Sequence, residues 1–330
     1  MPLRLPSDPP SMESEVAVSV EQVVSEIRIM NIMTEVPGFV LFKEAHLLKG
    51  KPSDAIISAW DEYNSQSTEG SFFPHPASYS DSSIFLVVEL GDAGEVLEHF
   101  EVNSIEKLWD IFLGVVMALS RAENFAEFEH RDLHENNICI STRERSKVSH
   151  SLPEAIKFGR SNLEVTLIDY GLSRAKMPNG DVVFFDLESD LEVFRGEDGK
   201  AQFDTYRRMR THLFTGKHTM FKRNWHTETS RSKNSGHTWA EYTPYSNVLW
   251  IKYLLKWLRT AYLKAIAPSD DSVEWNRTEG LSKLNKKLDV RTKYGAFESA
   301  TDVLVFAAEQ GWISAEQMES YGVDSSILSQ

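Results

Sequence analysis

The feature that most constrains the fold of this chain is a polar octapeptide set between apolar segments, His130-Arg131-Asp132-Leu133-His134-Glu135-Asn136-Asn137. Apolar side chains at three- and four-residue spacing precede it and predict a helix with one wide buried face: Leu108, Ile111, Phe112, Val115, Val116 and Leu119. Two short apolar segments, 138–140 and 165–168, follow and predict strands joined by a long hairpin loop. Polar, reactive side chains are therefore predicted to lie beside a core.

The spacing of Asp132 and Asn137 within this octapeptide matches the catalytic loop of kinases, in which an Asn follows the Asp five positions later. Phosphoryl transfer needs a carboxylate that accepts or orients the proton of the attacking hydroxyl, and an amide oxygen that holds Mg²⁺ against the phosphates. Asp132 is the candidate for the first role and Asn137 for the second. A surface loop with chance polar residues is the alternative, and the full match disfavours it.

A second motif, Asp169-Tyr170-Gly171, ends the second predicted strand. Kinases place a metal-binding Asp before an aromatic residue and a Gly in this part of the sequence. A carboxylate oxygen suits the hard Mg²⁺ ion, and Gly171 permits a sharp turn after it. Asp169 is therefore predicted to be a magnesium ligand, an interpretation that depends on its pairing with the catalytic loop.

Composition limits the possible functions. The 330 residues, of which 41% are hydrophobic and 25% charged, are typical of a globular chain. The formal net charge of −14 disfavours a general nucleic-acid or membrane-surface binder and favours a basic partner. Cys139 is the single cysteine, which excludes a disulfide framework and is typical of an intracellular protein. No apolar run approaches the ~20 residues of a membrane span, so none is predicted.

The chain pattern predicts two lobes. A helix is expected from Ser19 to about Ile32, and a buried strand from Ser83 to Leu90. The turn that follows this strand is expected to connect the lobes. Residues 103 and 106 have capping-box spacing at the start of the long helix. Seven acidic residues against one basic give 181–198 a charge of −6, and eight basic against two acidic give 201–235 a charge of +6.

These motifs and several further segments resemble one family, the haspin-like protein kinases. The similarity extends over most of the chain, from about residue 20 to about residue 310. The matching segments are 128–134, 168–174, 202–207, 241–250 and 299–302. The segment that ends at Trp250 is the most specific, because ordinary kinases carry an Ala-Pro-Glu element in that part of the fold and none occurs here.

The resemblance implies an α+β, protein-kinase-like fold with a truncated small lobe and a mainly helical large lobe. It divides the chain into a disordered tail (1–18), a remnant of the small lobe with the hinge (19–93), a large lobe (94–312) and a C-terminal tail (313–330). Within the large lobe, residues 207–236 are expected to form a basic insertion loop, interpreted as mobile rather than as a nucleic-acid site.

The resemblance also implies an activity, the ATP- and Mg²⁺-dependent phosphorylation of a threonine in a basic histone tail, in the nucleus. It assigns roles at the reaction centre and at the hinge that receives adenine. The implied catalytic residues are Asp132, Arg131 and Glu26; the implied cofactor contacts are Glu89, Gly91, Ala93, Asn137 and Asp169, of which Asn137 and Asp169 hold the metal. Glu26 corresponds to the helix-αC glutamate of kinases, and a solvated helix face is the alternative for it.

The acidic window falls on the activation segment, which in haspin-like kinases receives the basic tail. Four of its residues are implied to bind substrate: Asp186, Glu188, Asp190 and Glu192. Their sign suits a Lys- and Arg-rich partner. An ordinary solvated surface is the alternative for such a charge run.

The sequence departs from the kinase pattern before Glu26. The Gly-rich loop and the strand lysine are missing there, since the first glycine is Gly38 and the first lysine is Lys43. The chain therefore resembles a kinase without its first strands. A truncated gene model, a shortened pseudokinase and an enzyme that borrows another cation all fit.

Two competing functions stay open on the sequence. One is a non-catalytic module that binds basic tails in the acidic groove. The other is a small-molecule phosphotransferase of the aminoglycoside type, because Asp132-Leu133-His134 with Asn137 also resembles that family's loop. Arg131 and the segment 242–250 speak against the second.

Overall fold

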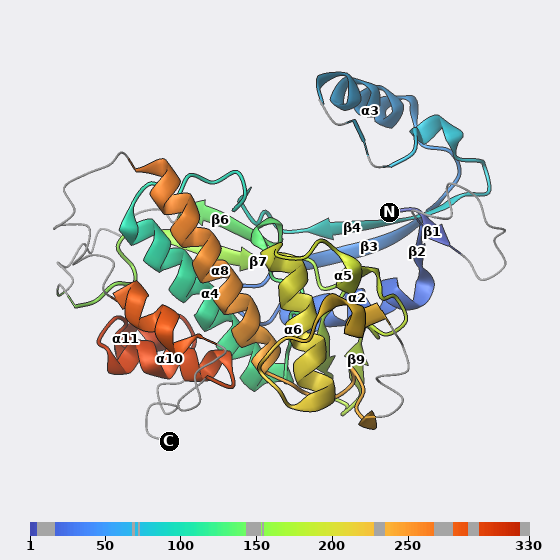
Figure 1. The fold of residues 1–330 in the computed structure, drawn as a ribbon. Helices are drawn as coiled ribbons and strands as arrows, with labels where there is room; N and C mark the ends of the chain where they lie inside the picture. The colour runs from blue at the N-terminus through green and yellow to red at the C-terminus, as the bar shows by residue number, and fades with distance from the viewer. Residues whose placement is uncertain are drawn as a thin grey trace.

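The computed structural model of the chain describes residues 1–4, 17–67, 70–71, 73–142, 153, 155–227, 235–266, 280–289 and 297–323. A long two-stranded ribbon, a short parallel strand pair and helices α2 and α3 form a small lobe, which is joined to a larger, mainly helical body (Figure 1). This arrangement confirms the predicted α+β fold. The elements of the small lobe are β1 (Leu3–Arg4), β2 (Val18–Ser19), α2 (Val20–Met33), β3 (Phe42–Lys49), α3 (Asp54–Gln66), η1 (Pro76–Ser78) and β4 (Ile84–Leu90).

Helix α2 is the helix predicted from the apolar spacing after Ser19. Ser19 begins it with a capping box, in which the Gln22 amide donates to the Ser19 hydroxyl at 3.2 Å and the Ser19 amide donates to the Gln22 side chain at 3.4 Å. Met30 and Met33, on its inner face, join the main hydrophobic core. Glu26 lies four residues before Met30 and therefore on the same side of the helix.

Strands β3 and β4 pair antiparallel, with Ala45 opposite Val88. The strand predicted at 83–90 is confirmed, but its predicted burial is wrong. Only Leu86 on β4 is buried, while Val87 is 44% exposed and Leu47 on β3 is 69% exposed. The two strands extend away from the body, as does α3, which has no buried residue (Figure 1).

The large lobe is organised around α4, whose apolar face lies at the centre of the core. Its elements are β5 (Glu95–Val96), α4 (Ile105–Ala126), η2 (Glu135–Asn137), β6 (Ile138–Thr142), β7 (Leu163–Leu167), β8 (Arg174–Lys176), β9 (Val182–Phe184), α5 (Glu192–Arg195), α6 (Ala201–Thr215), η3 (Arg223–Thr227), α8 (Tyr245–Ala265), α10 (Ala300–Glu309) and α11 (Ala315–Ser320). Helices α8 and α10 lie against α4 (Figure 1). The cap of α4 is Ser104, which accepts from the Lys107 amide at 3.2 Å, and not Asn103 as predicted.

The predicted strand pair after the octapeptide is confirmed as β6 and β7, which run antiparallel and continue a sheet of order β5-β6-β7. Ile138 lies opposite Leu167, so the octapeptide ends where the second motif begins. The Ile168 amide donates to the Asn137 carbonyl at 3.1 Å. The register therefore brings Asn137 and Asp169 together although they are far apart in the sequence.

Both predicted tails need correction where the structure describes them. In the region 1–18, β1 pairs in parallel with β2, and the Met1 ammonium group donates to the Leu86 carbonyl at 2.9 Å. In the region 313–330, α11 buries Met318, and Val323 is 4% exposed. The other residues of the two expected tails, 5–16 and 324–330, lie outside the described part of the chain.

The expected basic insertion loop at 207–236 is also wrong over its first part. Residues 207–215 belong to α6, and Arg207 and Arg210 are fully buried. Arg207 pairs with Asp204 at 2.7 Å on the same helix. Residues 228–234 are outside the described residues. No helix that the structure describes is long and apolar enough to span a bilayer.

Candidate active site

Asp132 lies in the loop between α4 and β6, where its side chain is 17% exposed. Tyr206, from α6, donates a hydrogen bond from its hydroxyl to Asp132 Oδ1. His134 Nε2 lies 3.6 Å from the same oxygen. Burial raises the pKa of Asp132 to about 6 and the negative charge of Asp169 adds to this, while His134 and the Tyr206 hydrogen bond act in the opposite direction. The carboxylate is therefore mostly ionised at neutral pH and close to the pKa that suits a general base.

Asn137 is buried, and its amide is oriented by the loop itself. Its Nδ2 donates to the Asp132 carbonyl at 2.8 Å. The amide oxygen therefore points away from this contact and is available as a metal ligand. Asp169 follows β7 and is exposed, with its Oδ1 accepting from the Gly171 amide at 3.1 Å. Its φ of 64° is a strained value for a residue with a side chain, of the kind that collects at functional sites. Two oxygen donors of this type fit Mg²⁺.

His130 and Tyr170 form the buried support beneath these groups. His130 Nε2 lies 3.1 Å from the Ile168 carbonyl, and the His130 amide donates to Asn247 Oδ1 at 3.1 Å. Tyr170 donates its hydroxyl to the Leu167 carbonyl at 2.8 Å. Burial lowers the pKa of His130 to about 4, so its imidazole is neutral at physiological pH. These contacts tie the catalytic loop to the strand that carries Asp169.

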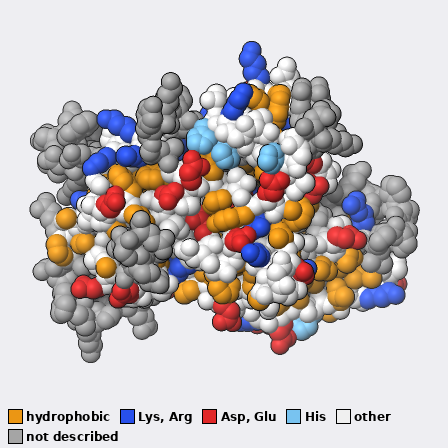
Figure 2. Space-filling view, turned by 90° about the horizontal axis from the view of Figure 1, so that it is seen from below, with side chains coloured by type: hydrophobic (Ala, Val, Ile, Leu, Met, Phe, Trp, Pro, Cys, Tyr) orange, Lys and Arg blue, Asp and Glu red, His pale blue; other side chains and the backbone are white. Residues whose placement is uncertain are grey.

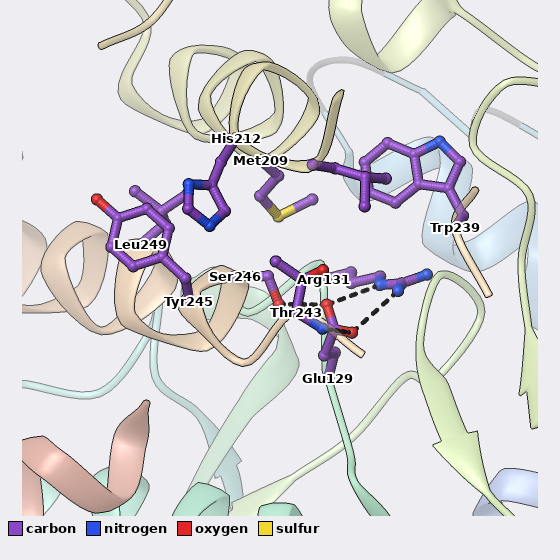
Figure 3. A pocket seen from close by; sticks show the side chains of 10 residues that line it. Glu129, Arg131, Met209, His212, Trp239, Thr243, Tyr245, Ser246 and Leu249 are labelled. Carbon is purple, nitrogen blue, oxygen red and sulfur yellow. Dashed lines mark hydrogen bonds and ion pairs between the residues drawn. The ribbon is translucent and has the colours of Figure 1, made fainter. Parts of the chain in front are cut away.

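Arg131 does not reach the reaction centre, which corrects its predicted catalytic role. It is 1% exposed and is held by Glu129 through Nε at 3.2 Å and Nη2 at 3.1 Å (Figure 3). Glu129 also accepts from the Thr243 amide and the Ser246 hydroxyl, both at 2.7 Å. These contacts fasten the loop to the start of α8, with the Arg131 guanidinium 5.2 Å from the Trp239 ring. Arg131 is a positioning residue.

Glu26 faces Asp169 from α2. Burial raises the pKa of Glu26 to about 7, and the charge of Asp169 adds to the shift. Within the described residues no lysine, arginine or histidine forms an ion pair with Glu26. Glu26 thus lacks, within the described residues, the cationic partner that kinases supply to the helix-αC glutamate, and its assignment to that role stays a prediction.

The predicted adenine contacts lie at the end of β4, where the lobes join. The Glu89 carboxylate is exposed and pairs with Lys43 Nζ at 3.0 Å, so only its backbone is left to face a base. The Gly91 amide donates to the Leu41 carbonyl at 2.7 Å and is therefore not available to hydrogen-bond a base. Adenine contacts by Glu89, Gly91 and Ala93 stay predictions, and for Gly91 they are restricted to its carbonyl.

The activation segment divides the predicted substrate residues into two groups. Asp186, Asp190 and Glu192 are exposed. Glu188 is not available, because its carboxylate binds Arg210 through Nε at 2.7 Å and Nη2 at 2.8 Å, and its side chain is only 11% exposed. The assignment of Glu188 to substrate binding is therefore corrected to an internal ion pair. Acidic and basic side chains are interspersed over the lower face of the molecule rather than forming one acidic surface (Figure 2).

Two residues of the site had no assigned role in the sequence interpretation. Tyr206 lies in the matching segment 202–207, but nothing in its local pattern indicated a contact with Asp132. Glu129 directly precedes the octapeptide, and two of the four hydrogen bonds that its carboxylate accepts come from Thr243 and Ser246, more than a hundred positions away. Only their place in the matching segments could have pointed to them.

Together, the two-lobed fold, the loop carrying Asp132 and Asn137, and Asp169 at the end of the adjoining strand define a protein kinase domain. The sequence model of the haspin-like kinase domain matches residues 5–307 of the chain. The chain belongs to the haspin-like kinase family.

Several curated proteins are similar to this chain. The serine/threonine-protein kinase haspin homolog hrk1 of Schizosaccharomyces pombe is 32% identical over 251 residues, which is 71% of this chain and 46% of that protein. Serine/threonine-protein kinase haspin of Bos taurus is 31% identical over 220 residues, 66% of this chain and 25% of the relative. The Drosophila melanogaster homolog is 31% identical over 219 residues, 66% of this chain and 34% of the relative. The chain thus spans less than half the length of these relatives.

Proposed function

We propose that this chain transfers a phosphoryl group from ATP to the hydroxyl of a serine or threonine in a protein. The observation that carries the proposal is the convergence of Asp132, Asn137 and Asp169 at one edge of the β5-β6-β7 sheet. The Ile168 amide donates to the Asn137 carbonyl at 3.1 Å, so the register of β6 and β7 sets Asp169 beside the loop, and the negative charge of Asp169 adds to the raised pKa of Asp132. Membership in the haspin-like kinase family supports the same reaction.

Each side chain has a distinct task in this proposal. Asp132 accepts or orients the proton of the attacking hydroxyl, and Tyr206 and His134 hold its carboxylate in place. ATP would supply the transferable phosphoryl group, and Mg²⁺ would neutralise phosphate charge, with Asn137 and Asp169 as its ligands. Glu129 and Arg131 keep the loop rigid, so that little reorganisation is needed during the reaction.

We further propose a basic histone tail as the substrate, with a threonine as the acceptor and the nucleus as the place of action. The supporting observation is a groove of about 480 Å³ between the start of α2 and the activation segment. Three acidic residues and one basic residue line it, namely Glu21, Asp186, Asp190 and Arg4. A groove of this charge favours Lys- and Arg-rich peptides over acidic ones.

A binding module without catalysis is the second candidate function. Glu26 favours it, because no basic side chain within the described residues pairs with that carboxylate, and a missing charge contact to the phosphates commonly costs a kinase orders of magnitude in rate. In that case the acidic groove would still hold a basic tail. The two candidates differ in a single observable, which is transfer of phosphate.

Substrate choice is tested with a histone-tail peptide that contains one threonine. Steady-state phosphorylation should be lost when the threonine is replaced by valine, and Asp186→Lys with Asp190→Lys should raise KM at nearly constant kcat. A double reversal of Asp54 and Glu62 on α3 changes the net charge equally and serves as the control. Equal KM values for the two double variants would contradict the groove as the tail site, and fluorescence of the tagged chain outside the nucleus would contradict the localisation.

A further inference from the structure

Two histidines and a glutamate converge where α6 ends and α10 begins. His212 lies in the last turn of α6, His218 follows that helix, and Glu298 immediately precedes the Ser299 cap of α10. One ligand atom from each of the three lies within 4.8 Å of those from the other two. His218 Nε2 and Glu298 Oε1 are 3.7 Å apart.

The backbone places these side chains for reasons unrelated to catalysis. Gly216 ends α6 with a φ of 64°, which reverses the chain and returns His218 over His212. The Glu298 amide donates to Asp302 Oδ2 at 2.8 Å, so the cap of α10 fixes the position of Glu298. The three residues therefore come from two helix ends whose geometry is independently set.

Tyr245, the first residue of α8, orders the two imidazoles. Its ring centroid lies 4.4 Å from that of His212 and 4.4 Å from that of His218, and the His218 ring is stacked on it at 14°. The close approach of the His212 and Tyr245 rings is visible in Figure 3. Tyr245 is buried, so the histidine rings rest on a fixed surface. Side chains held in this way bind a ligand with a small loss of conformational freedom.

The hydrogen-bonding capacity of His212 is poorly met. Its Nδ1 is buried and makes no hydrogen bond of normal geometry within the described residues, and the Lys217 backbone offers the ring only a poorly aligned contact. A buried polar atom without a partner is costly, and such atoms are rare in native structures. A metal ion would satisfy this side of the cluster.

We propose that His212, His218 and Glu298 bind a Zn²⁺ ion, with water in the fourth position. Two imidazole nitrogens and one carboxylate oxygen are a typical donor set for zinc, whereas Mg²⁺ and Ca²⁺ prefer oxygen ligands alone. Tetrahedral bonds of about 2.0–2.1 Å separate ligand atoms by roughly 3.3 Å, so ligand atoms that now lie within 4.8 Å of one another need to approach by at most about 1.5 Å. Glu298, whose side chain is 60% exposed, can move toward the imidazoles by rotation.

Such an ion would fasten the end of α6 to the start of α10. Because Tyr206 lies on α6 and donates to Asp132, the ion restrains the helix that supports the reaction centre. The proposal does not depend on phosphotransfer, since metal binding is measured without nucleotide or peptide.

The test uses the full chain, stripped with a chelator and titrated with Co²⁺, whose visible absorption reports tetrahedral coordination, and with Zn²⁺ followed by thermal unfolding. We expect one equivalent of metal to bind and Zn²⁺ to raise Tm. His212→Ala, His218→Ala and Glu298→Gln should each weaken binding by at least about tenfold. His46→Ala is the matched control, because His46 and Glu44 form an exposed histidine–carboxylate pair at 3.1 Å without a third ligand in the described residues.

Folding of each apo variant is checked by circular dichroism. Should His212→Ala fail to fold, the His218 and Glu298 variants decide the outcome. Absence of stoichiometric binding would overturn the proposal, and so would equal affinities of His218→Ala, Glu298→Gln and His46→Ala.

Discussion

Replacing Glu129 by Gln should destabilise the whole large lobe. The Glu129 carboxylate is 1% exposed and accepts hydrogen bonds from Arg131, the Thr243 amide and the Ser246 hydroxyl. Gln keeps the shape but removes the charge and turns an NH₂ group toward one of these donors. The Arg131 guanidinium, itself 1% exposed, is then left buried without a counter-charge.

The magnitude follows from the burial of both partners. Removing one member of a buried ion pair costs about 3–5 kcal/mol, because the other charge stays desolvated and unpaired. Folded domains are stable by only about 5–15 kcal/mol, so the loss is a large fraction of the total. Arg131→Met should cost a similar amount. The double variant should lose clearly less than the sum, since neither charge is then left alone.

Urea unfolding followed by tryptophan fluorescence measures this effect, since the chain has eight tryptophans. The midpoint of Glu129→Gln should fall at an unchanged denaturant slope. Arg195→Ala, which breaks the exposed Glu192–Arg195 pair, is the control and should leave the midpoint within error. A midpoint for Glu129→Gln equal to that control, or strictly additive losses in the double variant, would refute the reasoning.

Four further outcomes are expected. Tyr206→Phe removes a hydrogen bond to the Asp132 carboxylate worth about 1.5–3 kcal/mol, so the pKa of Asp132 should rise from about 6 by about one to two units. The acid limb of the kcat/KM profile should move up equally, and an unmoved limb would count against Asp132 as the base. Glu123 lies buried on α4, and burial raises its pKa from the ordinary 4.5 to about 7 in the folded chain. Between these two pH values the unfolded chain ionises first, so the free energy of unfolding falls as the pH rises. Urea titrations of the native chain should show the free energy of unfolding decline by on the order of 3 kcal/mol over that pH range, and Glu123→Gln should remove the decline. The same pH dependence in both proteins would contradict this prediction. Asp169→Ala should abolish any Mg²⁺-dependent thermal shift by ATP, and a retained shift would exclude it as the metal ligand. Gly94→Ala should lower the free energy of unfolding by at least about 2 kcal/mol, because φ of Gly94 is +90° and the new Cβ would lie 2.3 Å from the Ile140 carbonyl oxygen. An unchanged free energy of unfolding would contradict this backbone conformation.

Short-range patterns explain why much of the fold was predictable. The spacing of apolar residues after Ser19 indicated α2, and the residues around Asp132 and Asp169 carried the site in two short motifs. The paired strands β6 and β7 then brought Asn137 and Asp169 together, as their flanking positions predicted. Each of these features depends on residues close in sequence or on one strand pair.

Long-range charge pairing explains where the sequence misled. The −6 and +6 windows were interpreted as an acidic surface and a basic loop, yet they partly neutralise each other in the interior. Arg210 pairs with Glu188, and the buried Arg207 lies 3.6 Å from Asp198. Likewise, Arg131 belongs to the catalytic motif but faces Glu129 and α8 rather than the reaction centre. No local pattern distinguishes a solvated charge from one that finds a partner inside the fold.

The most direct test of the central claim is transfer of labelled phosphate from ATP to a threonine-containing histone-tail peptide, compared between the native chain and Asp132→Asn. The substitution keeps the size of the side chain and removes the proton acceptor. The native chain should transfer phosphate at least about 100-fold faster than the variant, with the phosphate located on the threonine by mass spectrometry. Equal rates, or no transfer by either protein while both still bind the peptide, would contradict a catalytic role for Asp132 and leave the chain as a binding module.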